Sequence, residues 1–254
     1  MNLKKLSIMD KFHENIKLVK MFDNISSTYD LLNHLLSFCI DLYWRKQLIN
    51  IIYEYIKKQQ NFKFYQKMIL DLATGTGDIA ILLAKKFQKD YIIAIDPSEK
   101  MLHIAKMKIK NNGLEQQIKL IQGYSHYIPF NNHTFDIITI SFGVRNFIEL
   151  NMSFREIFRI LKPIGLLGIL EFSQPSNVYI KKIYNFYSNV ILKHIGKKIS
   201  KNIFAYDYLQ NSIKTFSFFG KKMKDLLKYH NIPIVYMQKL TFGIVTIYLS
   251  KKPK

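Results

Sequence analysis

The chain has little cysteine, arginine, glycine or proline, and it lacks a long apolar run. A single cysteine, Cys39, cannot form an internal disulfide or a zinc site, which fits a reducing compartment. No stretch reaches the roughly 18 uninterrupted apolar residues that a membrane-spanning helix needs. Residues 1–17 are polar and lack the apolar core of a secretory signal. These absences exclude secreted, membrane-spanning and zinc-ribbon proteins.

Positive charge dominates the 254 residues. There are 38 Lys and Arg against 18 Asp and Glu, a formal net charge of +20. Such an excess usually indicates contact with nucleic acid or anionic lipid. Only 4 of the 38 are arginines, although proteins that bind phosphate favour the bidentate fork of arginine. We therefore interpret the charge mainly as the codon bias of an A/T-rich genome, and we expect no nucleic-acid partner.

The hydrophobicity pattern predicts an α/β fold. With 48% hydrophobic residues, the chain can bury one large core. Short apolar runs alternate with segments of helical spacing, which is typical of a Rossmann-like doubly wound sheet, mostly parallel, with helices on both faces. The expected strands are 67–72, 91–95, 118–122, 135–141 and 166–172.

We expect residues 1–254 to form one domain. Its core is 67–175, preceded by N-terminal helices at 14–60 and followed by a helical insertion at 176–230. Two β-branched runs in 231–250 predict an antiparallel hairpin at one edge of the sheet.

The strongest local signal is a glycine-rich turn after the first strand. It reads Asp71-Leu72-Ala73-Thr74-Gly75-Thr76-Gly77-Asp78. Gly75 and Gly77 let the backbone approach a ligand, and the N–H groups at the helix start present partial positive charge. Asp96 ends the next strand, where its carboxylate can accept hydrogen bonds from both hydroxyls of a ribose.

The ligand predicted at this turn has a cationic amino-acid part rather than a pyrophosphate. The dinucleotide fingerprint G-x-G-x-x-G is missing, and an acidic residue, Asp71, precedes the turn. S-adenosylmethionine is such a ligand; a tight βα turn without a ligand is the structural alternative. The seven histidines lack metal-ligand spacing, so we expect no metal.

Longer motifs are more specific than this turn. They are Met21-Phe22-Asp23, Tyr29-Asp30, Trp44-Arg45, Ser141-Phe142-Gly143-Val144-Arg145-Asn146-Phe147, Leu170-Glu171-Phe172-Ser173, Tyr184-Asn185-Phe186-Tyr187 and Ala205-Tyr206-Asp207-Tyr208-Leu209. With them the chain resembles the demethylmenaquinone and ubiquinone-biosynthesis C-methyltransferases over residues 19–250 or so. The resemblance implies the class I S-adenosylmethionine-dependent fold, with 14–60 as a lid, 67–175 as the cofactor-binding core and 176–230 on the substrate side.

The resemblance also implies which residues contact the cofactor. They are Thr76, Asp96, Tyr124, Ser125 and Ser141. Tyr124 stands where the family usually has Asp or Asn to accept the adenine amino group. Stacking or a backbone contact would have to replace that hydrogen bond.

Two further departures replace glycines that are usual in the family. Ile164 follows Lys162-Pro163, and Cys39 follows Ser37-Phe38. We interpret both as drift that lowers stability and leaves the reaction unchanged.

The family reaction puts a methyl group on a ring carbon of a reduced, polyprenylated quinone. The ring carbon becomes nucleophilic when the neighbouring phenol loses its proton, so the enzyme must align the reactants, exclude water and assist deprotonation. Arg145 and Asn146 follow the fourth strand, on the edge where open α/β sheets bind ligands. We predict that they are catalytic, with Tyr29 and Asp30 as contributions from the lid; an ion pair and a turn asparagine are the structural alternatives.

The residues of the G-V-R-N-F and Y-N-F-Y motifs resemble the menaquinone branch of the family more closely, so the expected substrate is demethylmenaquinol. The 2-methoxy-6-polyprenyl-benzoquinol intermediate of ubiquinone biosynthesis is the alternative, followed by RNA. RNA is disfavoured because the N-P-P-Y motif of base N-methylation is missing after the fourth strand. His126 and His133 are the histidines that we would test as bases.

The lipid tail of such a substrate predicts contact with a membrane surface. An aromatic stripe at 180–191 is of a kind that more often packs in a core, and here it can also line an isoprenoid tail. Lysines 181, 182, 193, 197 and 198 can rest on anionic headgroups. We expect a cytoplasmic protein, transiently peripheral on the inner face of the membrane; a homodimer is left open.

Overall fold

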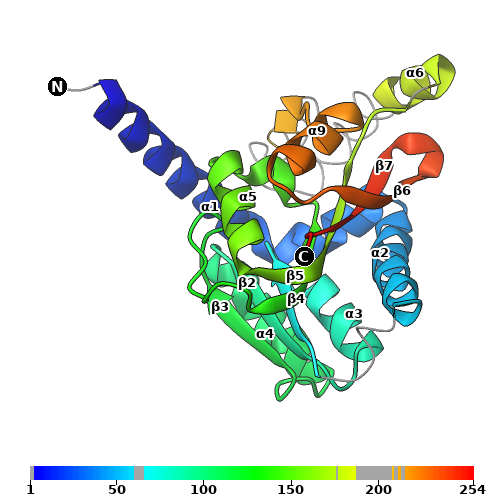
Figure 1. The fold of residues 1–254 in the computed structure, drawn as a ribbon. Coiled ribbons are helices and arrows are strands. Elements are labelled where there is room, and N and C mark those ends of the chain that lie inside the picture. The colour runs from blue at the N-terminus through cyan, green and yellow to red at the C-terminus, as the bar shows by residue number, and fades with distance from the viewer. Residues whose placement is uncertain (1–2, 60–65, 176, 187–207, 209–210, 213–214) are drawn as a thin grey trace.

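A seven-stranded sheet organises the chain (Figure 1). The computed structural model describes residues 3–59, 66–175, 177–186, 208, 211–212 and 215–254. The strands are β1 Met68–Leu72, β2 Tyr91–Asp96, β3 Ile118–Gln122, β4 Phe135–Ser141, β5 Leu161–Phe172, β6 Ile234–Leu240 and β7 Val245–Lys251. Their order is β3-β2-β1-β4-β5-β7-β6, with β1 to β5 parallel and β7 antiparallel to both of its neighbours. The predicted Rossmann-like sheet with its antiparallel C-terminal hairpin is confirmed.

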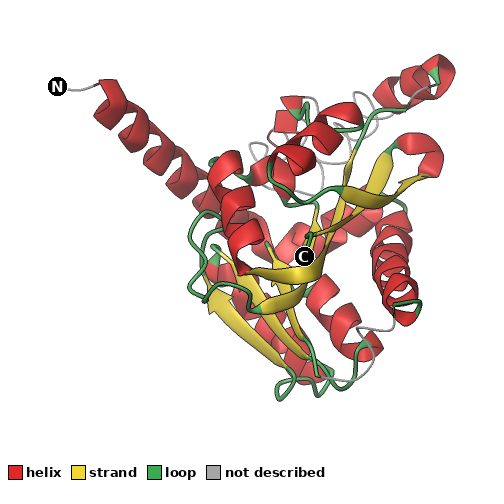
Figure 2. Cartoon of the chain, in the orientation of Figure 1, coloured by secondary structure: helices red, strands yellow, loops and turns green. Residues whose placement is uncertain are grey.

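Helices cover both faces of the sheet, as Figure 2 shows. One core cluster joins the sheet to α2 Ile40–Lys57, α3 Asp78–Lys86 and α4 Glu99–Asn111, and the other joins it to α5 Leu150–Ile160 and α9 Lys221–Tyr229. Helix α2 packs closely on β5 because Gly168 leaves room for it. A Cβ at Gly168 would lie only 2.7 Å from Cδ1 of Ile52.

The fifth strand begins earlier than expected, at Leu161 instead of residue 166. Leu161 pairs with Phe135, but the next pair is Ile137 with Leu166, so β5 carries an irregular stretch. Pro163 lies in that stretch, where the N–H that proline lacks is not needed for the ladder. The sequence pattern missed this part of the strand because its residues do not alternate regularly.

Two helices form the N-terminal segment predicted at 14–60, and the first of them begins earlier than predicted, at Leu3. Helix α1 spans Leu3–Leu36, and the chain turns at Ser37–Cys39 into α2. Of the insertion predicted at 176–230, the structure describes α6 Val178–Phe186 and α9. The end of the aromatic stripe and lysines 193, 197 and 198 lie outside the described residues. Among the helices that are described, none has the length and hydropathy to cross a bilayer.

Both residues that stand in place of a usual glycine have a left-handed backbone. The φ angle is 60° at Cys39 and 62° at Ile164. Outside glycine this conformation brings Cβ close to the following carbonyl oxygen, which costs roughly 1–2 kcal/mol. A β-branched side chain such as that of Ile164 is especially unfavourable there.

We predict that Cys39→Gly and Ile164→Gly each raise the free energy of unfolding by about 0.5–1 kcal/mol. The relief of strain exceeds the extra chain entropy that glycine adds to the unfolded state. Urea denaturation measures the change. Lys58→Gly is the control, because φ at Lys58 is −79° and glycine relieves nothing there. Destabilisation by both test substitutions would contradict the strain.

Candidate active site

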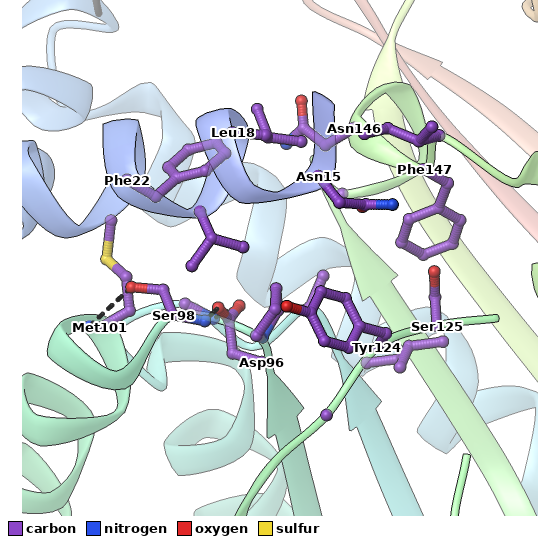
Figure 3. A pocket seen from close by; sticks show the side chains of 18 of the residues that line it. Asn15, Leu18, Phe22, Asp96, Ser98, Met101, Tyr124, Ser125, Asn146 and Phe147 are labelled. Atoms are coloured by element: carbon purple, nitrogen blue, oxygen red, sulfur yellow. Dashed lines mark hydrogen bonds between the residues drawn. The ribbon is translucent and has the colours of Figure 1, made fainter. Parts of the chain in front are cut away.

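Two hollows lie at the carboxyl edge of the sheet, near the point where the strand order reverses between β1 and β4. Crossovers leave this point in opposite directions, so the loops separate and make room for a ligand. We call the first hollow, which adjoins the glycine-rich turn, the turn pocket. The strand ends, the loops that follow them and the start of α4 contribute Leu72–Ala73, Gly75, Asp96–Ser98, Met101, Gly123–His126, Ser141–Gly143 and Asn146–Ile148 to its lining. Helix α1 contributes Asn15, Leu18, Val19, Phe22 and Tyr29. Figure 3 shows α1 passing across it opposite the loops.

Asp96 lies in the turn pocket with its carboxylate held at both oxygens. Oδ1 accepts from the backbone N–H of Ser98 at 2.9 Å, and Oδ2 accepts from that of Gly75 at 2.8 Å. Burial raises the pKa of Asp96 to about 6 in spite of these bonds, with a smaller contribution from the Asp23 carboxylate. The carboxylate therefore links the glycine-rich turn to the start of α4, at the wall of the turn pocket.

Tyr124, Ser125, His126 and Ser141 also line the turn pocket. The ring of Tyr124 lies beside Asp96 and Ser125 in Figure 3, and the hydroxyls of Ser125 and Ser153 are 2.8 Å apart. The hydroxyl of Ser141 is buried and, within the part of the chain that is described, has no hydrogen-bond partner. Buried polar groups are normally paired, so Ser141 fits a site that a polar ligand completes.

Asp71, Thr76 and Gly77 support the turn without lining the pocket. Asp71 is fully buried and accepts from the hydroxyls of Thr74 at 2.6 Å and Thr139 at 2.8 Å, and burial raises its pKa to about 7. Gly77 has φ 85°, and a Cβ there would lie 3.1 Å from Cβ of Ala105. These three residues support the turn from the side away from the pocket lining. Cofactor contact stays a prediction for each of them.

The second hollow, the Arg145 pocket, adjoins the first. It is lined by Glu14, Lys17, Leu18, Met21, Arg145, Asn146, Phe147, Ile148 and Tyr208. Leu18 and Asn146–Ile148 line both hollows. The two pockets therefore meet at Asn146.

Arg145 is buried in an ion pair with Glu171. Its Nη1 donates to Oε1 of Glu171 at 2.8 Å and to the carbonyl oxygen of Phe142, and its guanidinium lies over the rings of Phe142 and Phe172. Its Nε is buried and lacks a hydrogen-bond partner among the described residues. The ion pair that was the structural alternative to a catalytic role is therefore present, and Nε is a donor that the described residues leave unpaired.

The histidine candidates are separated. His126 lines the turn pocket. His133 precedes β4 and so lies at the opposite, amino edge of the sheet, where its Nδ1 is 3.3 Å from the carbonyl oxygen of Leu161 and from Nζ of Lys252. His133 lines neither pocket. Among the residues that the structure describes, no group of three or more His, Cys, Asp or Glu side chains could hold a metal.

Two carboxylates fasten α1 to the core. Asp23 accepts from the hydroxyl of Ser98 at 2.6 Å and from the backbone N–H of Lys100 at 3.2 Å, at the start of α4. Asp30 accepts from the hydroxyl of Thr76 at 2.6 Å. Seven residues separate the two aspartates, about two helical turns, so both lie on the face of α1 that meets the core.

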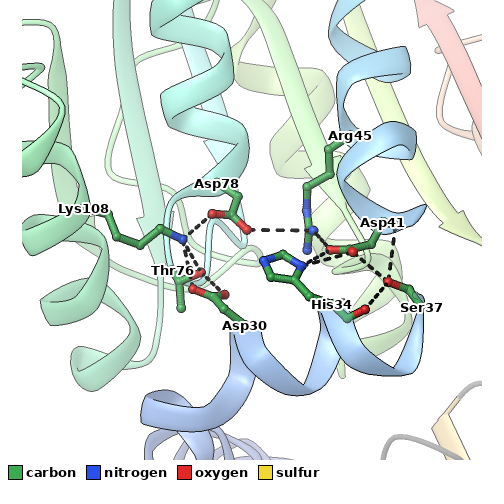
Figure 4. A network of polar contacts seen from close by, with 8 residues as sticks. All are labelled: Asp30, His34, Ser37, Asp41, Arg45, Thr76, Asp78 and Lys108. Atoms are coloured by element: carbon green, nitrogen blue, oxygen red, sulfur yellow. Dashed lines mark hydrogen bonds and ion pairs between the residues drawn. The ribbon is translucent and has the colours of Figure 1, made fainter. Parts of the chain in front are cut away.

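Lys108 joins the Asp30 contact to the start of α3 (Figure 4). Its Nζ lies 3.0 Å from Oδ2 of Asp30 and 3.3 Å from Oγ1 of Thr76, and it also pairs with Oδ1 of Asp78. One ammonium from α4 therefore contacts α1, the glycine-rich turn and α3. Charged groups that share a network in this way are held more firmly than an isolated surface pair.

A second cation continues the network towards the α1–α2 turn. Nη1 of Arg45 pairs with Asp41 and lies 3.8 Å from Oδ2 of Asp78. Asp41 also contacts Nδ1 of His34 at 2.9 Å and accepts from the hydroxyl of Ser37 at 2.7 Å. The hydrogen bonds and the Arg45 charge outweigh burial, so the pKa of Asp41 is lowered.

Sequence reasoning missed the roles of Asp23, Asp78, Lys108 and Tyr208. Asp23 had a signal, its spacing of seven residues from Asp30 on a predicted helix. Lys108 is one of 34 lysines and lies 78 residues from Asp30 along the chain, so nothing in the sequence distinguishes it.

Comparison with known proteins identifies the family. A model described as the ubiE/COQ5 methyltransferase family matches residues 9–252. The chain is 38% identical to a demethylmenaquinone methyltransferase of Bacteroides fragilis over 233 residues, 92% of this chain and 91% of that protein. It is 37% identical to the ubiquinone/menaquinone biosynthesis C-methyltransferase UbiE of Wigglesworthia glossinidia brevipalpis over 247 residues, 97% and 95% of the two chains.

Solved structures share the fold at low sequence identity. A SAM-dependent methyltransferase from Aquifex aeolicus matches with a TM-score of 0.53 and 18% identity, over 76% of this chain and 86% of that chain. The [4+2]-cyclase SpnF matches with a TM-score of 0.52 and 15% identity, over 82% and 80%. Since a cyclase shares the fold, the family rests on sequence similarity. The chain belongs to the ubiE/COQ5 methyltransferase family, and it has the fold of a class I S-adenosylmethionine-dependent methyltransferase.

Proposed function

We propose that this methyltransferase transfers the methyl group of S-adenosylmethionine to a ring carbon of demethylmenaquinol. The observation that carries the proposal is the junction of the two pockets at Asn146, which lets a donor in one pocket meet an acceptor in the other. The Bacteroides fragilis relative is named for demethylmenaquinone, whereas UbiE is named for both quinones. The benzoquinol of ubiquinone biosynthesis is therefore the second candidate.

The turn pocket suits S-adenosylmethionine. Asp96 would accept hydrogen bonds from the ribose, and the unpaired hydroxyl of Ser141 would meet a polar group of the ligand. Tyr124 would offer its aromatic face to the adenine, in place of the carboxylate or amide usual at this position. When bound, the sulfonium supplies an electrophilic methyl group.

The Arg145 pocket suits the ring of a quinol. The guanidinium of Arg145 favours the ionised form of a phenol placed beside it, so the pKa of that phenol falls. The proton can pass to water or to His126, which lines the neighbouring pocket. Asn146 lies where the pockets meet and can donate a hydrogen bond to the same oxygen. Ionisation raises the electron density on the ring carbon that receives the methyl group. That carbon would then lose its hydrogen as a proton, so that the ring becomes aromatic again, and S-adenosylhomocysteine would be the leaving group.

Helix α1 serves in this proposal as a lid. It contributes Tyr29 to the turn pocket and Leu18 to both pockets, and it is held there by Asp23 and Asp30. Closure keeps water from the reactants, which protects a phenolate and an electrophilic methyl group.

We propose a cytoplasmic protein in transient contact with the membrane that dissolves its substrate. In α6 the side chains of Val178 and Tyr179 are exposed beside those of Lys181 and Lys182, a combination that suits an anionic lipid surface. Nucleic acid does not enter the proposal. Arg45, Arg145 and Arg159, among the few arginines, are engaged with carboxylates of the chain itself.

The proposed reaction is tested with labelled S-adenosylmethionine and each demethylated quinol in detergent. We expect label in menaquinol, and more slowly or not at all in the benzoquinol. Arg145→Lys should lower kcat about tenfold or more, because lysine keeps the positive charge but lacks the planar, bidentate donors of the guanidinium. The Kd for S-adenosylmethionine should stay within about twofold of the wild type. Transfer to neither quinol would refute the proposed function, and full turnover by Arg145→Lys would refute the role of the guanidinium fork.

Tyr124 is expected to hold the adenine by stacking. Tyr124→Ala should raise the Kd for S-adenosylmethionine about tenfold, because base–aromatic stacking contributes about 1–3 kcal/mol. Tyr124→Phe is the matched control and should stay within about twofold of the wild type. Calorimetric titration measures both. An unchanged Kd in Tyr124→Ala would show that the ring does not contact the base.

Lys108 is expected to hold the lid closed. Lys108→Met leaves Asp30 and Asp78 without their shared cation, and we expect limited proteolysis within α1 to become about fivefold faster, equivalent to ~1 kcal/mol. The Kd for S-adenosylmethionine should rise with it. Lys106→Met, an exposed residue of the same helix, is the control. Equal cleavage rates in the two variants would contradict the role of Lys108.

A further inference from the structure

Tyr208 lies in the wall of the Arg145 pocket and contacts Asn146. Its hydroxyl donates to Oδ1 of Asn146 at 3.0 Å. Its ring packs edge-on against Phe22 of the lid helix, with 6.2 Å between the ring centroids. Tyr208 therefore connects the asparagine at the junction of the pockets to α1.

The hydroxyl of Tyr208 is a donor at physiological pH. Burial raises the pKa of Tyr208 to about 12; the charge of Arg145 lowers it, while Glu14 and Glu171 raise it. A protonated phenol is a stronger donor than acceptor, because its oxygen lone pair is delocalised into the ring, and the carbonyl oxygen of an amide is a strong acceptor. The hydrogen bond from Tyr208 to Oδ1 therefore favours one of two carboxamide orientations that are almost the same in shape.

We infer that Tyr208 is a positioning residue, which fixes the Asn146 carboxamide so that its NH₂ group, and not its oxygen, is available to the substrate. The inference rests on the proposed function, because it assigns the oxygen of a quinol as the acceptor. With Oδ1 engaged by Tyr208, Nδ2 lies at the other end of the planar carboxamide and can donate to a phenolate oxygen.

The opposite orientation would hinder the reaction. A carboxamide rotated by half a turn would place its carbonyl oxygen against the developing phenolate, where two negative partial charges repel each other. Without the Tyr208 hydroxyl, nothing in this contact selects between the orientations. The benefit of Asn146 should then depend on Tyr208, and the two residues should act as one unit.

The first test is a double-mutant cycle on methyl transfer. Tyr208→Phe should lower kcat about tenfold, the effect of one lost hydrogen bond of ~1.4 kcal/mol, with KM for the quinol and Kd for S-adenosylmethionine within about twofold. In an Asn146→Ala background the same substitution should change kcat less than twofold. A tenfold loss in both backgrounds would overturn the inference, because Tyr208 would then act independently of Asn146.

The second test does not require turnover. The probe is 4-nitro-1-naphthol, a two-ring phenol whose phenolate absorbs visible light. Binding to the wild-type protein should lower the apparent pKa of the probe, and Tyr208→Phe should reduce that shift by about one unit, the equivalent of the tenfold loss in kcat. Equal shifts in the two proteins, or a wild-type protein that does not ionise the probe, would overturn the inference.

The two tests separate this inference from the proposed function. If neither quinol is methylated and the probe still distinguishes Tyr208→Phe from the wild type, the substrate is wrong and the positioning role stands. If menaquinol is formed and Tyr208→Phe matches the wild type in kcat and probe shift, the function stands and the positioning role is wrong.

Discussion

The attachment of helix α1 to the core is the interaction on which the site depends. The carboxylates of Asp23 and Asp30 reach from one helix to the start of α4 and to the glycine-rich turn, and Lys108 neutralises the second of them. Without α1, both pockets would lose one wall. The proposed lid role requires a contact that can also open, and hydrogen bonds and ion pairs between partly exposed groups can break while the core stays folded.

The buried pair of Arg145 and Glu171 is the second constraint. Glu171 comes from β5 and Arg145 from the 3₁₀ turn that follows β4, so the pair joins the ends of two adjacent parallel strands. Removing either partner would leave an isolated buried charge, at a cost of several kcal/mol. The same pair keeps a guanidinium beside the Arg145 pocket without a mobile side chain. In the proposed reaction, this structural role and a chemical role coincide at Arg145.

Local patterns sufficed to predict most of the fold and part of the site. An apolar run predicts strand β4, and closely spaced glycines predict the turn at Gly75–Gly77. The position of Asp96 at the end of a strand predicts that it lies at the edge of the sheet where the pocket is. The contacts of Lys108 and Tyr208 join segments 78 and 62 residues apart, and ordinary residue types carry them. Composition and periodicity do not predict such contacts, because the contacts form only when distant segments pack together.

The most direct test is the rate of backbone amide hydrogen exchange across residues 18–30 of α1. It is measured without ligand, with S-adenosylmethionine, with demethylmenaquinol and with both. If α1 closes over two adjoining pockets, each ligand alone should slow exchange there, and the two together should slow it most. Exchange that both ligands leave unchanged would contradict the account, because α1 would then not be the shared lid of the two pockets.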